Sequence, residues 1–169
     1  QSPPMSSVRS SKKSPSVPAP ADTAAPASEP VDTGFLRTLV GYNTRRAALS
    51  IIAVFMERMA VYDLKVVDFS VLSLVAHNPG ITSRQLCATL SVLPPNMVGL
   101  IAALERRGLI ERRPHPSDGR AMGVHLTPAG VELTAQAEQT AAQLEEDATN
   151  RLTAAERKTL IRLLQKVYD

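Results

Sequence analysis

Two short helices joined by a tight link constrain the fold of this chain more than any other feature of its sequence. Thr82 and Gln85 have the spacing of a capping box, which predicts a helix over residues 82–90. A second helix is predicted over residues 95–107, because Pro95 fits a first helical turn, where its missing N–H has no partner to lose. Such a pair is typical of a helix-turn-helix, whose second helix enters the major groove of DNA.

A predicted β-hairpin follows the two helices directly. Residues 109–113 and 121–126 are predicted strands, and residues 114–120 form a polar tip between them. In the second strand every other side chain is apolar, which predicts that Met122, Val124 and Leu126 face the core. A hairpin in this place can reach the minor groove beside the recognition helix. We therefore predict a mainly α fold with a small β-hairpin wing, a winged helix-turn-helix.

Longer helices are predicted on both sides of this unit. Apolar residues recur at three- and four-residue steps over residues 33–59, without an interrupting proline, which indicates one long amphipathic helix. Asp68 is the predicted cap of a helix that stops at the Asn78-Pro79-Gly80 turn. Thr127-Pro128 opens a helix to about residue 150, and a capping box at Thr153 opens the last one.

The first 32 residues differ from the rest in composition. They hold seven of the thirteen prolines and eight serines, so they bury too little apolar surface to offset their ordering entropy and are predicted to be a disordered tail. Residues 1–4 precede Met5 and have the character of a cloning remnant. Arg9, Lys12 and Lys13 are either a basic arm for DNA phosphates or part of a solvated tail, and the second reading is favoured.

Composition excludes several classes of function. The chain has one cysteine, Cys87, which excludes an intramolecular disulfide framework and a thiolate zinc cluster. The three histidines do not have metal-ligand spacing, so neither a metal nor another cofactor is expected. No Ser-His-Asp set, phosphate-binding glycine loop or carboxylate pair indicates an enzyme. With six aromatic residues and no tryptophan, a stacking platform for single-stranded nucleic acid is hard to build. No apolar run approaches the ~20 residues of a membrane span, so a cytoplasmic protein is expected.

Charge is distributed unevenly along the chain. Residues 82–126 hold six arginines and three acidic residues, a net charge of +3, whereas residues 127–150 hold five acidic residues and no basic one. Arginine suits phosphate and groove contacts, although arginines also lie on ordinary solvated faces. The pattern favours double-stranded DNA as the partner of the predicted winged unit.

Four segments resemble the MarR family of bacterial transcription regulators. They are Leu104-Glu105-Arg106-Arg107-Gly108-Leu109-Ile110-Glu111-Arg112-Arg113, Asp118-Gly119-Arg120, Leu126-Thr127-Pro128-Ala129-Gly130 and the closing segment over residues 152–166. The resemblance implies a homodimer on a pseudo-palindromic operator, with N-terminal (33–66) and C-terminal (127–169) dimerisation helices interlocking around a DNA-binding lobe (67–126). It also implies that Asp118 braces the wing while Arg120 enters the minor groove, where narrow A·T stretches attract arginine. The alternative is that these two side chains only pair across the turn.

The predicted recognition helix departs from the family pattern. Pro95 and Gly99 occupy positions where the family often has a hydroxyl residue and then arginine, so Asn96 is the one obvious side chain for hydrogen bonds to base edges. Its alternative role is a helix-start cap. Apolar contacts of Pro95 or Met97 with thymine methyl groups, together with DNA shape, are then expected to supply much of the sequence preference. The predicted DNA-contacting residues are Arg84, Pro95, Asn96, Met97, Arg112, Arg113, Ser117, Asp118 and Arg120.

The resemblance further implies a repressor that a small, often aromatic, acid releases from DNA. Residues 41–49 resemble, more loosely, members that control nicotinate breakdown, so a hydroxylated nicotinate is one expected effector. A carboxylate suits paired arginines, and the predicted effector residues are Tyr42, Arg45, Arg46 and His77. The alternatives are solvated or dimer-bridging arginines and a helix-end role for His77. Two other functions remain open: a thiol-based redox sensor using Cys87, and a winged-helix protein–protein module.

Overall fold

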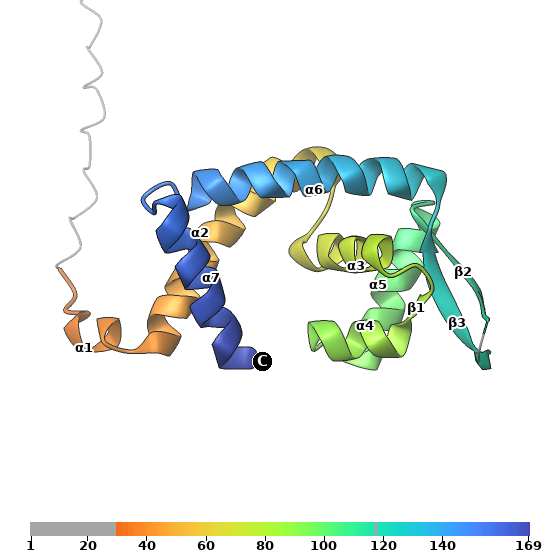
Figure 1. Cartoon of the computed structure of the whole chain (residues 1–169), viewed down its shortest axis with the longest axis horizontal. Coiled ribbons are helices and arrows are strands. Elements are labelled where there is room, and N and C mark those ends of the chain that lie inside the picture. The colour runs from red at the N-terminus through yellow and green to blue at the C-terminus, as the bar shows by residue number, and fades with distance from the viewer. Residues whose placement is uncertain (1–29, 117) are drawn as a thin grey trace, which may run out of the picture. The chain divides into compact units, whose positions relative to one another are not determined.

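The computed structural model describes residues 30–116 and 118–169, and the side chains of residues 118–120 are not described (Figure 1). Residues 1–29 of the predicted tail (1–32), with Arg9, Lys12 and Lys13, therefore lie outside the described residues. The chain divides into two units, residues 1–33 and residues 34–169. The described part of the first unit, residues 30–33, carries no helix or strand. Every element named below belongs to the second unit.

The second unit is mainly helical with one small antiparallel sheet, as the sequence predicts. Its described elements, in chain order, are α1 (Gly34–Arg37), α2 (Val40–Met59), the 3-10 turn η1 (Ala60–Tyr62), α3 (Val66–His77), β1 (Ile81–Thr82), α4 (Ser83–Leu90), α5 (Pro94–Arg106), β2 (Ile110–His115), β3 (Asp118–Leu126), α6 (Pro128–Ala148) and α7 (Ala154–Tyr168). Figure 1 shows α6 crossing above α2 at one end and above α3 at the other. Helix α6 thus connects the winged unit to the terminal helices.

The predicted helix over residues 33–59 is broken. Leu39 is extended, with φ −91° and ψ 128°, and separates the single turn α1 from α2. The Asn43 side chain explains the break, because its Nδ2 donates to the carbonyl oxygens of Arg37 and Leu39, both at 2.8 Å. The first of these hydrogen bonds satisfies the Arg37 carbonyl, which a continuous helix would pair with a backbone N–H, whereas the Leu39 carbonyl also accepts the Asn43 backbone N–H at 3.2 Å.

Helix α3 begins two residues before the predicted cap. Lys65 is its N-cap, and Asp68 stands at the third helical position, where Oδ2 accepts a hydrogen bond from the Lys65 backbone N–H at 3.1 Å. The prediction of Asp68 as N-cap was therefore wrong by one turn. A carboxylate in the first turn still stabilises the helix through its dipole.

The helix-turn-helix has the predicted caps and limits. Thr82 caps α4 by accepting from the Gln85 backbone N–H, while Gln85 Oε1 accepts from the Thr82 backbone N–H at 2.9 Å. Ser91 adopts a left-handed conformation that ends α4, and Pro94 opens α5. Among the described helices no single one is long and apolar enough to cross a bilayer; α4 and α5 together are, but their link bends them by 116°.

The wing belongs to a three-stranded sheet rather than to a hairpin alone. Strand order is β1-β3-β2, with Ile81 opposite Val124 and Ile110 opposite Leu126. Strands β2 and β3 extend to His115 and Asp118, so the tip is shorter than predicted. Of the predicted core residues Val124 is buried, but Met122 is 45% exposed, because it lies nearer the tip and borders an open hollow.

The base of the wing is fixed to the start of α6 at one corner. The Thr127 backbone N–H donates to the Leu109 carbonyl at 3.0 Å, and its hydroxyl donates to the Gly108 carbonyl at 2.6 Å. A Cβ atom on Gly130 would lie 1.9 Å from the same Leu109 oxygen, so glycine is required there. The Leu126-Thr127-Pro128-Ala129-Gly130 motif thus has a structural role at the junction of α5, β2 and α6.

Candidate DNA-binding interface

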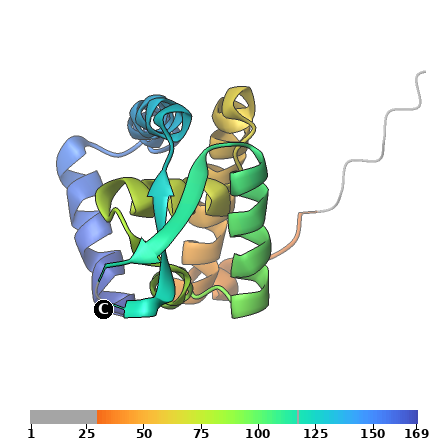
Figure 2. The ribbon, with the colours of Figure 1, turned by 90° about the vertical axis from the view of Figure 1, so that its right-hand side faces the viewer.

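Helix α5 and the β2-β3 hairpin lie side by side on one face of the second unit (Figure 2). The Arg112 guanidinium on β2 holds the Glu105 carboxylate of α5 in a two-pronged ion pair, with N–O distances of 2.9 and 2.7 Å. Planar bidentate pairing of this kind fixes orientation as well as distance. The predicted recognition helix and the base of the predicted wing are therefore held together by side chains.

The buried side of α5 determines which residues face outward. Met97, Ile101 and Leu104 follow one helical face and are at most 3% exposed. Pro95 and Asn96 are exposed, as DNA contacts require. The prediction that Met97 contacts thymine methyl groups is contradicted, because its side chain is completely buried in the core.

Two exposed apolar residues of this face were not among the predicted contacts. Leu93 is 69% exposed and Val98 is 60% exposed. The sequence already indicated that Met97 is buried and Val98 exposed. Residues 97, 101 and 104 have the spacing of one buried helix face, and Val98 lies one residue out of step with that series.

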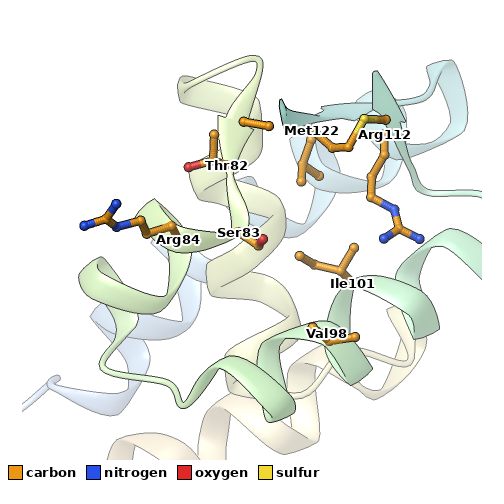
Figure 3. A pocket seen from close by; sticks show the side chains of 9 residues that line it. Thr82, Ser83, Arg84, Val98, Ile101, Arg112 and Met122 are labelled. Atoms are coloured by element: carbon orange, nitrogen blue, oxygen red, sulfur yellow. The ribbon is translucent and has the colours of Figure 1, made fainter. Parts of the chain in front are cut away.

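A hollow of about 370 Å³ lies between the start of α4, α5 and the wing (Figure 3). It is lined by Thr82, Ser83, Arg84, Val98, Ile101, Arg112, Ala121, Met122 and Val124. Figure 3 shows Arg84 pointing away from the other lining residues. Its position is exposed, near the start of α4. Most of the other lining residues are apolar, and Arg112 borders the hollow from β2.

The wing residues are described only in part. Arg113 is exposed and forms an ion pair with Glu111, two residues before it on the same strand. Ser117 lies outside the described residues, and so do the side chains of Asp118 and Arg120, whose backbone belongs to β3.

Comparison with known proteins decides the family. A sequence model of the MarR family matches residues 62–121. The multiple antibiotic resistance protein MarR of Salmonella typhimurium is 36% identical over 106 residues, which are 62% of this chain and 74% of that protein. This chain belongs to the MarR family.

Other members and their structures agree with this assignment. A putative transcriptional regulatory protein for the hcr operon of Thauera aromatica is 37% identical over 100 residues, so the match spans 59% of this chain but only 60% of that relative. A structure of the transcriptional repressor CouR bound to a 23-mer DNA duplex is 34% identical, with a TM-score of 0.78, and the match covers 83% of this chain and 99% of that one. A structure concerned with the regulation of DNA binding of Bordetella bronchiseptica BpsR by 6-hydroxynicotinic acid is 27% identical, with a TM-score of 0.71 and coverage of 78% and 94%.

In this MarR-family chain the four predicted effector residues lie on two separate helices of one protomer. Tyr42, Arg45 and Arg46 lie in the first turns of α2, with both arginines exposed, whereas His77 ends α3. Figure 1 shows these two segments at separate places in the unit. His77 Nε2 instead lies 2.9 Å from Glu138 Oε1 on α6, which also accepts a hydrogen bond from the Ser73 hydroxyl.

Cys87 lies on α4, partly buried against the core of the winged unit. The sequence holds no second cysteine that could resolve an oxidised thiol. Among residues 30–116 and 118–169, no group of three His, Cys, Asp or Glu side chains is placed to hold a metal ion.

Proposed function

We propose that this chain is a sequence-specific DNA-binding repressor that acts as a homodimer and leaves its operator when a small aromatic acid binds. The observation that supports DNA binding most directly is the fixed pairing of α5 with the wing through Glu105 and Arg112. The two elements that enter neighbouring grooves in winged helix proteins are thereby presented on one face. CouR, a relative of similar fold, is bound to a DNA duplex in its structure.

Arg84, Pro95, Asn96, Arg112, Arg113, Ser117, Asp118 and Arg120 remain the proposed DNA contacts after the removal of Met97. Arg84 is proposed to bind a phosphate, because its side chain is exposed and extends from the start of α4. Asn96 is proposed to read adenine, whose N6 and N7 suit an amide side chain. Arg112 also orients the wing, because it pairs with Glu105 of α5, whereas Arg113 pairs with Glu111 within β2.

Dimerisation is proposed from the terminal helices. No residue of α7 is buried, although its sequence has an apolar face. The exposed large apolar residues of α1, α2, α7 and the link between α1 and α2 include Phe35, Leu36, Leu39, Val40, Leu160, Ile161, Leu163, Val167 and Tyr168. A surface of this kind on a helix marks a protein interface. We propose that residues 33–66 and 127–169 of two copies interlock there.

DNA binding is tested by affinity measurements at several salt concentrations. The full chain first selects duplexes from a random library, and its affinity for a selected duplex is then measured. Each phosphate contact contributes about −0.9 to the slope of log affinity against log salt concentration. Arg84→Ala is expected to reduce the magnitude of that slope by about one. Arg84→Lys, which keeps the positive charge at the same position, is the matched control and is expected to keep the slope. A slope near zero, or equal affinity for random DNA, refutes the proposal.

The effector is proposed to bind Tyr42, Arg45, Arg46 and His77, brought together by the dimer or by a change in conformation. Paired arginines bind a carboxylate well, and the BpsR structure concerns a hydroxylated nicotinate. Hydroxylated nicotinates and benzoates are titrated against the complex with DNA. Release by one of them, weakened in Arg45→Gln, supports the proposal. Retention of DNA across both series contradicts it.

A protein–protein module is the second candidate function, because Leu93 and Val98 leave apolar surface on the recognition helix. That function predicts binding without salt-dependent DNA affinity, so the same titration separates the two candidates.

A further inference from the structure

The outward face of α5 has an unusual composition. From Ser91 to Leu104 the sequence contains no charged residue. Nevertheless Leu93, Pro95 and Val98 are exposed in this segment. A helix face in contact with water normally carries charged or polar side chains. This composition therefore fits a face that is covered when the protein acts.

Gly99 is a second, independent feature of the same face. It is exposed inside α5, and a Cβ atom built on it would meet nothing within 4 Å. Glycine inside a helix is less stable than alanine, and no contact with the described residues requires glycine at position 99, in contrast to Gly130. Gly99 follows Pro95 by one helical turn and adjoins Val98. Because Gly99 has no side chain, the helix surface beside Pro95 and Val98 lies closer to the backbone there. A small residue at this place allows a partner to approach the helix backbone closely.

We infer that Leu93, Pro95 and Val98 select operator half-sites through the 5-methyl groups of thymine, and that Gly99 lets α5 lie deep in the major groove. The inference rests on the proposed DNA binding. The thymine methyl is the apolar group that the major groove presents, whereas G·C pairs present hydrogen-bond donors and acceptors and no methyl group there. An apolar side chain would leave those donors and acceptors unpaired, which is costly. Half-sites rich in A·T pairs follow, with Asn96 suited to adenine.

Charge around the face favours DNA over a protein partner. Residues 82–126 carry a net charge of +3, and Arg84 is exposed beside the hollow that Val98 also lines. Glu105, at the far end of α5, is already held by Arg112. The basic residues near this face suit the phosphates of DNA. The uncharged apolar face itself suits the thymine methyl groups in the major groove.

Deoxyuridine substitution tests the inference, because it removes the thymine methyl and keeps the base-pairing edge. Thymines in a selected duplex are replaced singly, and thymines outside the half-sites serve as controls. Each contacted methyl that is lost is expected to weaken binding about fourfold, the equivalent of ~0.8 kcal/mol for one buried methyl group. In Val98→Ala, the penalty at the contacted thymine is expected to fall by half or more, since the side chain that covers the methyl has been shortened.

Gly99→Ala distinguishes an effect on the fit of α5 in the major groove from an effect on the stability of the protein. The free energy of unfolding is expected to rise, because alanine favours the helix and the added Cβ has room. Affinity for the selected duplex is expected to fall at least tenfold, because the Cβ meets the base edges. A merely structural role for Gly99 would not combine a more stable protein with weaker DNA binding.

Three outcomes overturn the inference. Equal affinity for thymine and deoxyuridine duplexes would overturn the thymine contacts and leave the proposed DNA binding intact. Selected half-sites rich in G·C pairs would have the same consequence. Unchanged DNA affinity in Val98→Ala and Gly99→Ala, with altered self-association, would show that the face binds protein instead. Failure to select any duplex would remove the proposed function first, and the inference with it.

Discussion

Met97 and Val98 are neighbours in sequence, but the structure predicts opposite effects for their replacement by alanine. Met97 is completely buried, so Met97→Ala is expected to lower the free energy of unfolding by about 2–5 kcal/mol, through lost transfer energy and the cavity left behind. Val98 is 60% exposed. Val98→Ala removes two methyl groups, each worth ~0.8 kcal/mol when fully buried. Since only about two fifths of Val98 is buried, the expected loss is ~0.6 kcal/mol, and the higher helix propensity of alanine largely offsets it.

Urea denaturation at one fixed protein concentration measures both variants, since a dimer's apparent stability depends on concentration. With a slope of about 2 kcal/mol/M, Met97→Ala is expected to lower the midpoint by about 1–2.5 M, and Val98→Ala by less than about 0.3 M. Met97→Leu is the control, since a volume-conserving change costs less than about 1.5 kcal/mol. Equal midpoints for Met97→Ala and the parent would refute the burial argument, and a large loss in Val98→Ala would refute the exposed placement.

Three further predictions concern other contacts. Glu105→Gln is expected to lower the free energy of unfolding by about 0.2–1 kcal/mol and to speed amide exchange in β2, because Arg112 loses its ion pair; unchanged exchange would show that the pair does not hold the wing. Hydrogen bonds from the backbone and hydroxyl of Thr153 hold the pKa of Glu156 below its usual 4.5, so this cap stabilises α7 above that pH and is lost as pH falls through the lowered pKa. Circular dichroism from about pH 6 to about pH 3 is expected to show an acid loss of helix that Glu156→Gln, which keeps the cap, reduces. Leu163→Glu is expected to raise the dimer dissociation constant at least tenfold, or ~1.4 kcal/mol, because it places a charge on the exposed apolar face of α7. Sedimentation experiments measure this constant, and an equal effect of a polar change elsewhere on α7 would contradict a specific interface.

Local signals in the sequence were sufficient for most of the fold. The Thr82 and Thr153 caps are confirmed because a capping box depends on residues only three positions apart. The break before α2 was missed, since apolar spacing continues across it and the hydrogen bond from the Asn43 side chain to the Arg37 carbonyl leaves no trace in that spacing.

The candidate site was harder to predict than the fold. An uncharged segment such as that of α5 gives little contrast between its faces, so Met97 was assigned to the surface although its spacing with Ile101 and Leu104 matched the core. The residues proposed for the effector lie on separate elements, and short-range patterns carry no information about which distant segments meet. The three-stranded sheet was missed for a similar reason, because β1 has only two residues.

The corner made by Gly108, Leu109, Thr127 and Gly130 limits how a signal can travel through the protein. Two hydrogen bonds and a backbone contact with no spare room join the end of the recognition helix, the root of the wing and the first turn of α6. We therefore expect these three parts to move together. In the proposed homodimer, a ligand that tilted α6 by a small angle would displace α5 and the wing with it and change the distance between the two proposed DNA-reading helices.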